Sequence, residues 1–573
     1  MSASVSYRVL LVLPWLIASC GGPTPERAPQ TSVPSFEAVS RDFIYGSLAL
    51  SPVAATGAGY HRHNGAALDE LLDDYSAEGL EKQRDFYKGL TAHTGALDVG
   101  RLDKEQQADL AIIKSNLALS LLELDTIQSY KHNPTIYVEL IGNALFSPMV
   151  LDYAPKDTRF HAIVKRLEKI PALLQQAKTN LVDAPEVWNR VARDENEGNI
   201  ELIDRTLRAD VPDAQKADFS KAADSALAAL RDFTAHLKDT LSRKPGEWRL
   251  GREKYALKFQ YVLDIGKTPE QLLAEAEAGM VSVRAEMEKL AAPRTTKQAL
   301  DEIAKQHSTP ATYMDAAKKT LAQATSFVRD KGLVTLPTRG NLQVIETPAF
   351  MRGVYAVGGF NAAPALEPQL GAFYWVTPIP KGWPPDRVES KLREYNDYGL
   401  QELTIHEAMP GHYVQLEYAN DVQPETRRLL RNIFGNGPYI EGWGFYVQQV
   451  MSDEGYLNNS KELRLSYLKQ ALRGLANTIL DVRLQTMGMT DQQALDLMIN
   501  DGFQEREEAT AKLQRAQLSS CQLPTYFAGW RGWLEVREHD RQRKGPSFSL
   551  REFHDRALKE SAVPLPVLDR LLQ

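Results

Sequence analysis

Residues 403–415 read LTIHEAMPGHYVQ, and this stretch decides which fold class the sequence predicts. It contains two histidines, His406 and His412, and a glutamate, Glu407, directly after the first of them. A zinc site needs neutral imidazoles, usually one carboxylate ligand, and an open position for a water whose proton a second carboxylate takes. We therefore predict that His406 and His412 are metal ligands and that Glu407 is the general base.

The spacing of the two histidines departs from the HExxH motif, in which they lie four residues apart on one helix face. His412 follows His406 by six residues, and a regular helix would turn it about 240° away from His406. Pro410 has no N–H for the His406 carbonyl and its ring clashes with that carbonyl, so the helix is predicted to kink or bulge there. A two-residue distortion, which Gly411 permits, would restore a relation like i, i+4.

A third ligand is predicted at Glu441, 29 residues beyond His412. This glutamate begins an apolar segment that includes Trp443 and Phe445 and that is expected to be buried. A buried carboxylate without a partner is costly, so a cation is its natural partner. Two alternatives stay open: Glu441 caps a helix N-terminus, and the two histidines are ordinary core residues.

The first twenty residues resemble the signal peptide of a bacterial lipoprotein. Arg8 precedes an apolar run over residues 9–18, and Cys20 follows small residues in the manner of a lipobox. The run is shorter than the roughly 20 residues that span a bilayer. We predict a signal peptide over 1–19 and a lipidated Cys20 with a tether over 20–38. The protein is then anchored in the bacterial cell envelope, at the outer membrane facing the periplasm, unless the segment is an ordinary secretory leader.

Composition places the rest of the chain among globular proteins, with 43% hydrophobic and 25% charged residues. The net charge of −7, and the lack of a basic run interleaved with aromatics, argue against a nucleic-acid partner. Once Cys20 is lipidated, only Cys521 remains, so the mature chain forms no internal disulfide. Cys521 is either a buried thiol or a nucleophile. The oligomeric state is not readable from the sequence.

Apolar residues recur at helical spacing in most of the chain, and the clearest cases are residues 108–124, 160–181, 222–241 and 269–290. Thr268 and Thr490 are predicted to cap helix starts with their side-chain oxygens. The sequence therefore predicts a mainly α fold.

Between residues 332 and 377 the pattern changes to short strands, predicted over 333–336, 342–345 and 371–376. This small β element before the catalytic helix either holds an extended substrate by β-addition or is packed for stability alone. We expect an N-terminal helical lobe over 39–340 and a catalytic lobe over 341–573, or one continuous domain over 39–573.

The two motifs together, HExxPGH at 406–412 and EGW at 441–443, resemble those of the bacterial domain of unknown function 885 family. Further similarity to this family is found at residues 52–60, 166–171, 553–555 and 564–566. The resemblance implies a helical, zincin-like metallopeptidase fold of two lobes with a central channel, similar in outline to carboxypeptidase Taq and the thimet oligopeptidase group. It also implies one zinc ion per chain and peptide substrates.

The resemblance further suggests roles for residues near the C-terminus. Tyr526, in the segment QLPTYFAG, is the candidate oxyanion donor, an effect of about 3 kcal/mol for one well-placed donor; a purely structural aromatic is the alternative. Arg515 and Gln522 are candidate substrate-binding residues. One position departs from the family pattern, because many relatives carry a histidine where this chain has Gln485, and an amide cannot become cationic.

These observations predict a zinc-dependent peptidase of the cell envelope, acting as an oligopeptidase or in the manner of a carboxypeptidase. A second hypothesis is a non-catalytic envelope lipoprotein that uses the helical scaffold as a binding module, which Gln485 and the unusual histidine spacing would favour. A third is a metal-dependent hydrolase of another amide or ester.

Overall fold

The computed structural model describes residues 34–347 and 358–573, so the predicted signal peptide, Cys20 and most of the tether lie outside the described residues. The protein is 72% helix and 4% strand, which confirms the predicted mainly α class. Helix α1 (Phe36–Leu50) already begins within the segment assigned to the tether. None of the described helices combines the length and the apolarity needed to cross a bilayer.

Contacts between residues divide the described chain into two units. The N-terminal unit consists of residues 34–183 and 199–244, and the C-terminal unit of residues 184–198, 245–347 and 358–573. Helix α7 (Glu186–Glu201) contributes to both units. Residue 340, the predicted boundary between lobes, lies inside the C-terminal unit.

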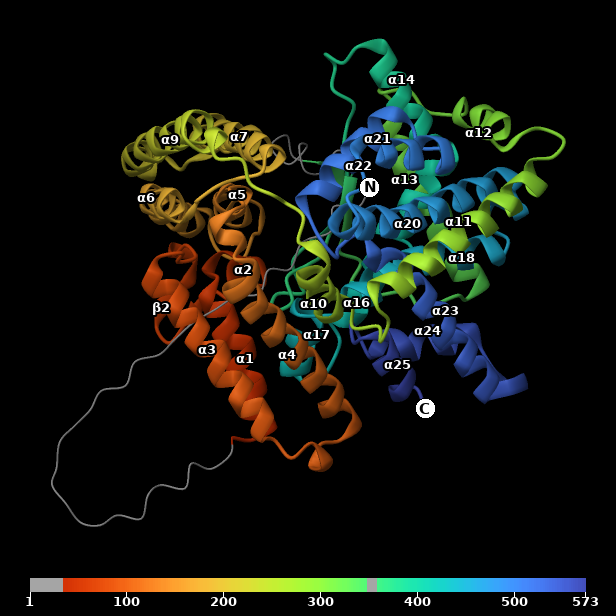
Figure 1. Cartoon of the computed structure of the whole chain (residues 1–573), viewed down its shortest axis with the longest axis horizontal. Coiled ribbons are helices and arrows are strands. Elements are labelled where there is room, and N and C mark those ends of the chain that lie inside the picture. Colours follow the sequence, from red (N-terminus) through yellow and green to blue (C-terminus); the bar gives the residue numbers. More distant parts are fainter. Residues whose placement is uncertain (1–33, 348–357) are drawn as a thin grey trace. The chain divides into compact units, whose positions relative to one another are not determined.

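The N-terminal unit is a stack of helices in which α6 packs against α5 and α9 (Figure 1). Besides α1, the unit contains a two-stranded hairpin and further helices. Their bounds are α2 (Pro52–Gly57), β1 (Arg62–His63), β2 (Ala66–Ala67), α3 (Ala77–Ala96), α4 (Lys104–Leu122), α5 (Thr135–Val150), α6 (Lys156–Asn180), α8 (Arg208–Asp210) and α9 (Lys216–Asp239). Three predicted helices, over 108–124, 160–181 and 222–241, are confirmed as α4, α6 and α9 with small shifts at their ends.

Arg166 lies at the middle of α6 and is fully buried. Its guanidinium donates hydrogen bonds to the carbonyls of Leu71 at 3.1 Å and Ala144 at 2.7 Å, and to the hydroxyl of Thr56 at 2.7 Å. It thereby joins α2, α5, α6 and the segment after β2 through groups that would otherwise be buried acceptors.

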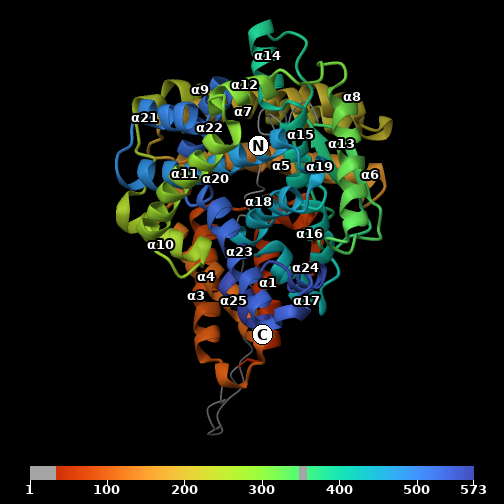
Figure 2. The ribbon, with the colours of Figure 1, turned by 90° about the vertical axis from the view of Figure 1, so that its right-hand side faces the viewer.

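The C-terminal unit contains the remaining helices and a small sheet: α10 (Gly251–Leu263), α11 (Pro269–Ala291), α12 (Thr296–Ala304), α13 (Tyr313–Lys331), α14 (Pro385–Glu394), α15 (Asp397–Glu407), α16 (His412–Ala419), α17 (Glu425–Ile433), α18 (Gly437–Asp453), α19 (Tyr456–Asn459), α20 (Lys461–Thr486), α21 (Asp491–Asp496), α22 (Arg506–Leu518), α23 (Pro524–Lys544), α24 (Leu550–Lys559) and α25 (Leu565–Leu571). The predicted helix over 269–290 is α11, and Thr268 and Thr490 cap α11 and α21 as expected. Helix α20 packs against α11, and α18 packs against α23 (Figure 2).

The sheet of the C-terminal unit has the order β3-β5-β4. Strands β3 (Leu342–Glu346) and β5 (Ala372–Val376) run parallel and confirm two predicted strands, whereas β4 (Gly358–Asn361), antiparallel to β5, was not predicted. Helix α14 separates β5 from α15, and the Tyr374 hydroxyl lies 3.1 Å from that of Thr404, so β5 is tied to the helix that carries His406.

The strand predicted over residues 333–336 is wrong, because this segment pairs with side chains and not with another strand. The backbone N–H of Thr335 donates to Asp555 at 2.8 Å, and its carbonyl accepts from the Tyr418 hydroxyl at 3.0 Å. The carbonyl of Leu333 lies 2.7 Å from Nδ1 of His554. With these polar groups satisfied, the apolar residues of the segment pack without a β ladder.

Candidate metal centre

The break between the two histidines is a full helix end, not the kink or bulge that the sequence predicted. Helix α15 ends at Glu407, and α16 begins at His412. A Cβ atom on Gly411 would lie 1.9 Å from the carbonyl oxygen of His406 and 2.3 Å from that of Ile405, so only glycine fits this close approach. The chain turns within residues 408–411 and starts a new helix with His412 at its first position.

The EGW segment holds this turn in place. Trp443, on α18, is fully buried and its indole N–H donates to the carbonyl of Pro410 at 2.9 Å. Glu441 lies in the second turn of the same helix, whose N-terminus is capped by the side chain of Asn436 accepting from the N–H of Tyr439. Because Asn436 is the cap, Glu441 does not serve that purpose.

The three predicted ligands meet at one point. Oε2 of Glu441 lies 3.6 Å from Nε2 of His406 and 3.7 Å from Nε2 of His412, and the ligand atoms of all three residues lie within 4.8 Å of one another. Tetrahedral coordination with bonds of about 2.0–2.1 Å would place ligand atoms about 3.3 Å apart. Gly444 makes room for this arrangement, since a Cβ atom there would lie 2.4 Å from the His406 ring. The three side chains can hold a metal ion.

Burial and charge at the site fit a bound cation. The three side chains are buried, and within the described residues Nε2 of His406, Oε2 of Glu441 and Oε1 of Glu407 have no hydrogen-bond partner. Burial would raise the pKa of Glu441, but the two imidazoles beside it hold that pKa well below its ordinary value. Burial likewise lowers the pKa of His412, yet the neighbouring Glu441 raises it above its ordinary value. A carboxylate this deep is stable only beside positive charge.

The second ring nitrogen of His412 is oriented by a neighbouring amide. Nδ1 of His412 lies 3.3 Å from Oε1 of Gln415, whose own amide N–H donates to the carbonyl of Tyr439 at 3.3 Å. Donation from Nδ1 to this oxygen leaves Nε2 unprotonated and facing Glu441, which is the tautomer that a metal ligand requires.

A pocket that is partly open to solvent lies beside the centre. Of the three predicted ligands, His406 lines this pocket, together with residues of α15, α18, α20, α22, α23 and the link between α14 and α15. The lining residues are Tyr395, Gly399, Leu403, His406, Glu407, Phe445, Gln448, Gln470, Arg473, Asn477, Lys512, Arg515 and Tyr526. The predicted base Glu407 and the predicted oxyanion donor Tyr526 therefore face the same space. The ring centroids of His406 and Tyr526 are 6.4 Å apart.

Comparison with known proteins assigns the family. A family model described as "Bacterial protein of unknown function (DUF885)" matches residues 52–572. The chain belongs to this family. A solved structure of a candidate lipoprotein of unknown function from Shewanella oneidensis is 30% identical to this DUF885 protein, with a TM-score of 0.79, 94% of this chain covered and 100% of the other. A candidate lipoprotein from Colwellia psychrerythraea shares the fold at 17% identity, with a TM-score of 0.76 and coverage of 94% and 98%. No curated protein matches the sequence.

The other predicted site residues of this DUF885 protein occupy different positions. Arg515 lines the pocket and donates to Oε1 of Gln522 at 2.9 Å and to the Tyr526 hydroxyl at 3.1 Å. Gln522 is absent from the residues that line the described pocket, but its amide lies 3.4 Å from the same hydroxyl. Arg515 and Gln522 thus orient Tyr526.

Two further residues singled out in the sequence have structural contacts. Gln485 accepts from the backbone N–H of Leu250 at 2.9 Å and donates to the carbonyl of Ser519 at 3.2 Å, so both ends of its amide are engaged by backbone. Cys521 is fully buried, with its Sγ 3.9 Å from the carbonyl of Tyr255, which fits a buried structural thiol.

Sequence reasoning missed two cations of the pocket, Arg473 on α20 and Lys512 on α22. The spacing of Glu508, Lys512 and Arg515 at i, i+4 and i+7 places these three charged residues on one face of α22, a pattern typical of a solvated face, so it does not indicate that Lys512 is buried. Arg473 carries no signal of burial either, because its partners Glu394 and Glu508 come from distant segments of the chain.

Proposed function

We propose that this DUF885 protein is a zinc-dependent peptidase, anchored through a lipid on Cys20 in the bacterial cell envelope. The observation that carries the proposal is the juxtaposition of three buried ligand atoms, all within 4.8 Å of one another, with a further buried group, Glu407, that faces the pocket lined by His406. Two imidazoles and one carboxylate form the ligand set of one class of catalytic zinc site. An adjacent second carboxylate, which is not a ligand, takes the proton of the water.

Zinc suits the donor set better than the harder cations, which prefer oxygen ligands throughout. An ion held by His406, His412 and Glu441 would supply Lewis acidity toward the scissile carbonyl and toward water. One ion per chain is expected, because among the described residues the only group of this kind is the one formed by these three side chains.

Two side chains of the pocket supply the remaining chemistry. Glu407 lies directly after a metal ligand with its Oε1 unengaged by any described hydrogen-bond donor. It would take the proton of the attacking water and pass it to the leaving amine. Tyr526, oriented by Arg515 and Gln522, would donate from its hydroxyl to the oxyanion. This division of roles corresponds to a zincin-like mechanism.

The cellular location rests on the N-terminal sequence and on the relatives. Cys20 follows a short apolar run and small residues, and the two solved structures that share the fold are described as candidate lipoproteins. The pattern after Cys20 favours the outer membrane, with the enzyme facing the periplasm and meeting peptides there.

The decisive experiment is the digestion of a peptide library by purified protein, with and without a chelator, followed by mass spectrometry. Glu407→Gln should retain about one zinc per chain and lose about 10²–10⁴-fold of the peptide hydrolysis rate, the range for a general acid–base residue. Glu402→Gln is the matched control: Glu402 is equally buried on α15, its carboxylate lacks a hydrogen-bond partner within the described residues, and it does not line the pocket. This variant should keep its activity.

Each result decides between the hypotheses. Retained turnover in Glu407→Gln would remove Glu407 from the mechanism. A folded protein that binds no zinc and cleaves no peptide would favour the non-catalytic binding lipoprotein. Zinc binding with cleavage of esters or other amides, but not of peptides, would favour the third hypothesis.

A further inference from the structure

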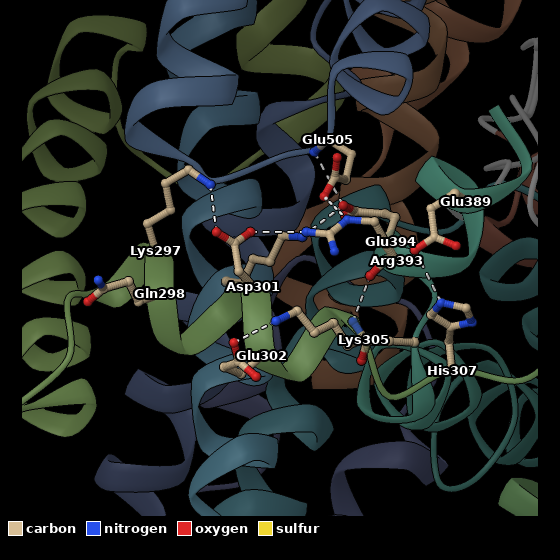
Figure 3. Close-up of polar contacts among 12 residues, drawn as sticks. Lys297, Gln298, Asp301, Glu302, Lys305, His307, Glu389, Arg393, Glu394 and Glu505 are labelled. Atoms are coloured by element: carbon tan, nitrogen blue, oxygen red, sulfur yellow. Dashed lines mark hydrogen bonds and ion pairs between the residues drawn. The ribbon is translucent and has the colours of Figure 1, made fainter. Parts of the chain in front are cut away.

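Two arginines in and near the pocket are paired with opposite charge. Arg393 contacts Asp301 at 3.0 Å and Glu505 at 3.2 Å (Figure 3). The same is true of Arg473, a lining residue, which lies 3.6 Å from Glu394 and also binds Glu508. These guanidinium groups are therefore neutralised within the fold.

Lys512 differs from these two arginines. It lines the pocket, its exposed fraction is 2%, and it makes no hydrogen bond or ion pair within residues 34–347 and 358–573. Burial lowers the pKa of Lys512 well below its ordinary value, and the nearby guanidinium groups of Arg473 and Arg515 lower it further. Glu508 and Glu441 act in the opposite direction without compensating. A buried amine in this setting lacks an anion.

The neighbouring cation, Arg515, is already engaged by side chains of the protein. Arg515 already donates to Gln522 and Tyr526, and its guanidinium fixes the candidate oxyanion donor. Lys512 lies one turn earlier on the same face of α22, with no such engagement among the described residues. The pocket thus presents one candidate reacting carboxylate, Glu407, and one buried amine with no partner in the described part of the chain, whose protonated form a bound carboxylate would stabilise.

Lys512 shares the pocket with other deeply buried side chains. Arg473 and Asn477 of α20, which line the pocket with it, are 6% and 2% exposed. A substrate end bound beside them would meet the Lys512 amine. A chain end that meets a lysine is a carboxylate.

We propose that Lys512 binds the C-terminal carboxylate of the substrate, which makes the enzyme a carboxypeptidase or a peptidase that releases short C-terminal fragments. The inference rests on the proposed peptidase function and names its substrate class: peptides with a free C-terminus. Hydrolysis breaks the C–N bond near that end, water supplies hydroxide to the carbonyl carbon and a proton to the amine, and the released fragment carries the carboxylate paired with Lys512.

Matched peptide pairs test this assignment. Each pair has one sequence with either a free C-terminal acid or an amide, and both members are N-acetylated so that the N-terminus is constant. Wild-type protein should cleave the acid with a kcat/KM about 10–100-fold above that of the amide, the range for a hydrogen bond between charged groups. The preference should fall close to one in Lys512→Met and persist in Lys512→Arg.

Lys391→Met is the control for the loss of another lysine, one on the neighbouring helix α14. Lys391, on α14, lies over the ring of Tyr395 at 5.0 Å and does not line the pocket, so this variant should keep the wild-type preference. Zinc content and thermal unfolding, measured on every variant, show whether the fold and the metal site are intact.

The outcomes separate this inference from the function on which it rests. Cleavage of acid and amide peptides at equal rates by wild-type protein overturns the inference and leaves the peptidase in place, whether or not Lys512→Met folds. A preference that follows acidic side chains irrespective of the C-terminus overturns it as well, as does an undiminished acid preference in zinc-loaded Lys512→Met. Absence of cleavage of any peptide overturns the proposed function itself.

Discussion

Two regions of the molecule bury charge, and they do so in opposite ways. In the N-terminal unit, Arg166 is fully buried and its guanidinium donates to acceptors from three other segments of the chain. In the C-terminal unit, His406, Glu407 and Glu441 are also buried, yet each keeps an oxygen or nitrogen without a described hydrogen-bond partner.

The difference shows how to separate structural polar groups from functional ones. A buried polar group that is fully satisfied by the chain stabilises the fold, because removing it leaves its partners unpaired. A group that the chain leaves unsatisfied contributes little to folding and costs desolvation energy, so its retention needs another cause. Lys512 belongs to this second class, and Arg473, paired with Glu394 and Glu508, to the first.

The largest expected effect is at Arg166, the buried group whose hydrogen-bond acceptors are supplied by the chain. Arg166→Met should lower the free energy of unfolding of the N-terminal unit by about 3–5 kcal/mol, because several buried carbonyls and the Thr56 hydroxyl lose their donor at once. Denaturant unfolding followed by circular dichroism measures the loss. Arg101→Met, at an arginine whose side chain is 87% exposed, is the control and should change little. A stable Arg166→Met protein would break the comparison.

A satisfied histidine in the C-terminal unit offers a second test. Nε2 of His554 accepts from the Tyr446 hydroxyl at 2.7 Å, and Nδ1 donates to the Leu333 carbonyl. Burial lowers the pKa of His554 to about 4. Between about pH 6.5 and pH 4 the unfolded chain therefore binds more protons than the native protein, so stability falls with falling pH, by about 3 kcal/mol in total. Above pH 6.5 this contribution is fully present.

The measurement compares wild type with His554→Gln, which does not titrate in this range. The difference between their unfolding free energies should shrink by about 3 kcal/mol on going from pH 7 to pH 4. Tryptophan fluorescence follows the unfolding, and the Trp443 ring, 5.3 Å from that of His554, contributes to the signal. A difference that is constant with pH would show that His554 titrates normally.

Much of the fold was predictable because the helices are long and amphipathic. The helical spacing in residues 160–181 and 269–290 and the cap at Thr268 appear in the structure as expected. The failures have physical causes. Residues 333–336 have a strand-like composition, but their backbone pairs with Asp555 and Tyr418, more than 80 residues away in sequence. Only the tertiary structure brings those partners together.

The candidate site was predictable in composition but not in geometry. The histidine spacing, Pro410 and Gly411 indicated a broken helix, yet the sequence did not show that the helix ends at Glu407 and restarts at His412. The Trp443 indole that holds this turn acts across 33 residues of sequence. Lys512 was missed because an isolated lysine on a charged helix is usually exposed, and its burial depends on how α22 packs against α20.

The smallest expected effect concerns the orientation of one ligand. Gln415 lies 3.3 Å from Nδ1 of His412, and its loss in Gln415→Leu should weaken zinc binding about 10-fold, the lower end of the range for groups that orient metal ligands. Gln401→Leu removes another buried amide, one that accepts from Tyr456 and lies on α15 outside the pocket lining, and should leave zinc affinity unchanged. Competition with a zinc indicator at constant pH measures both. Equal zinc affinity in the two variants would mean that His412 is oriented by packing alone. The metal centre would then depend less on its surrounding hydrogen bonds than the Arg166 region does.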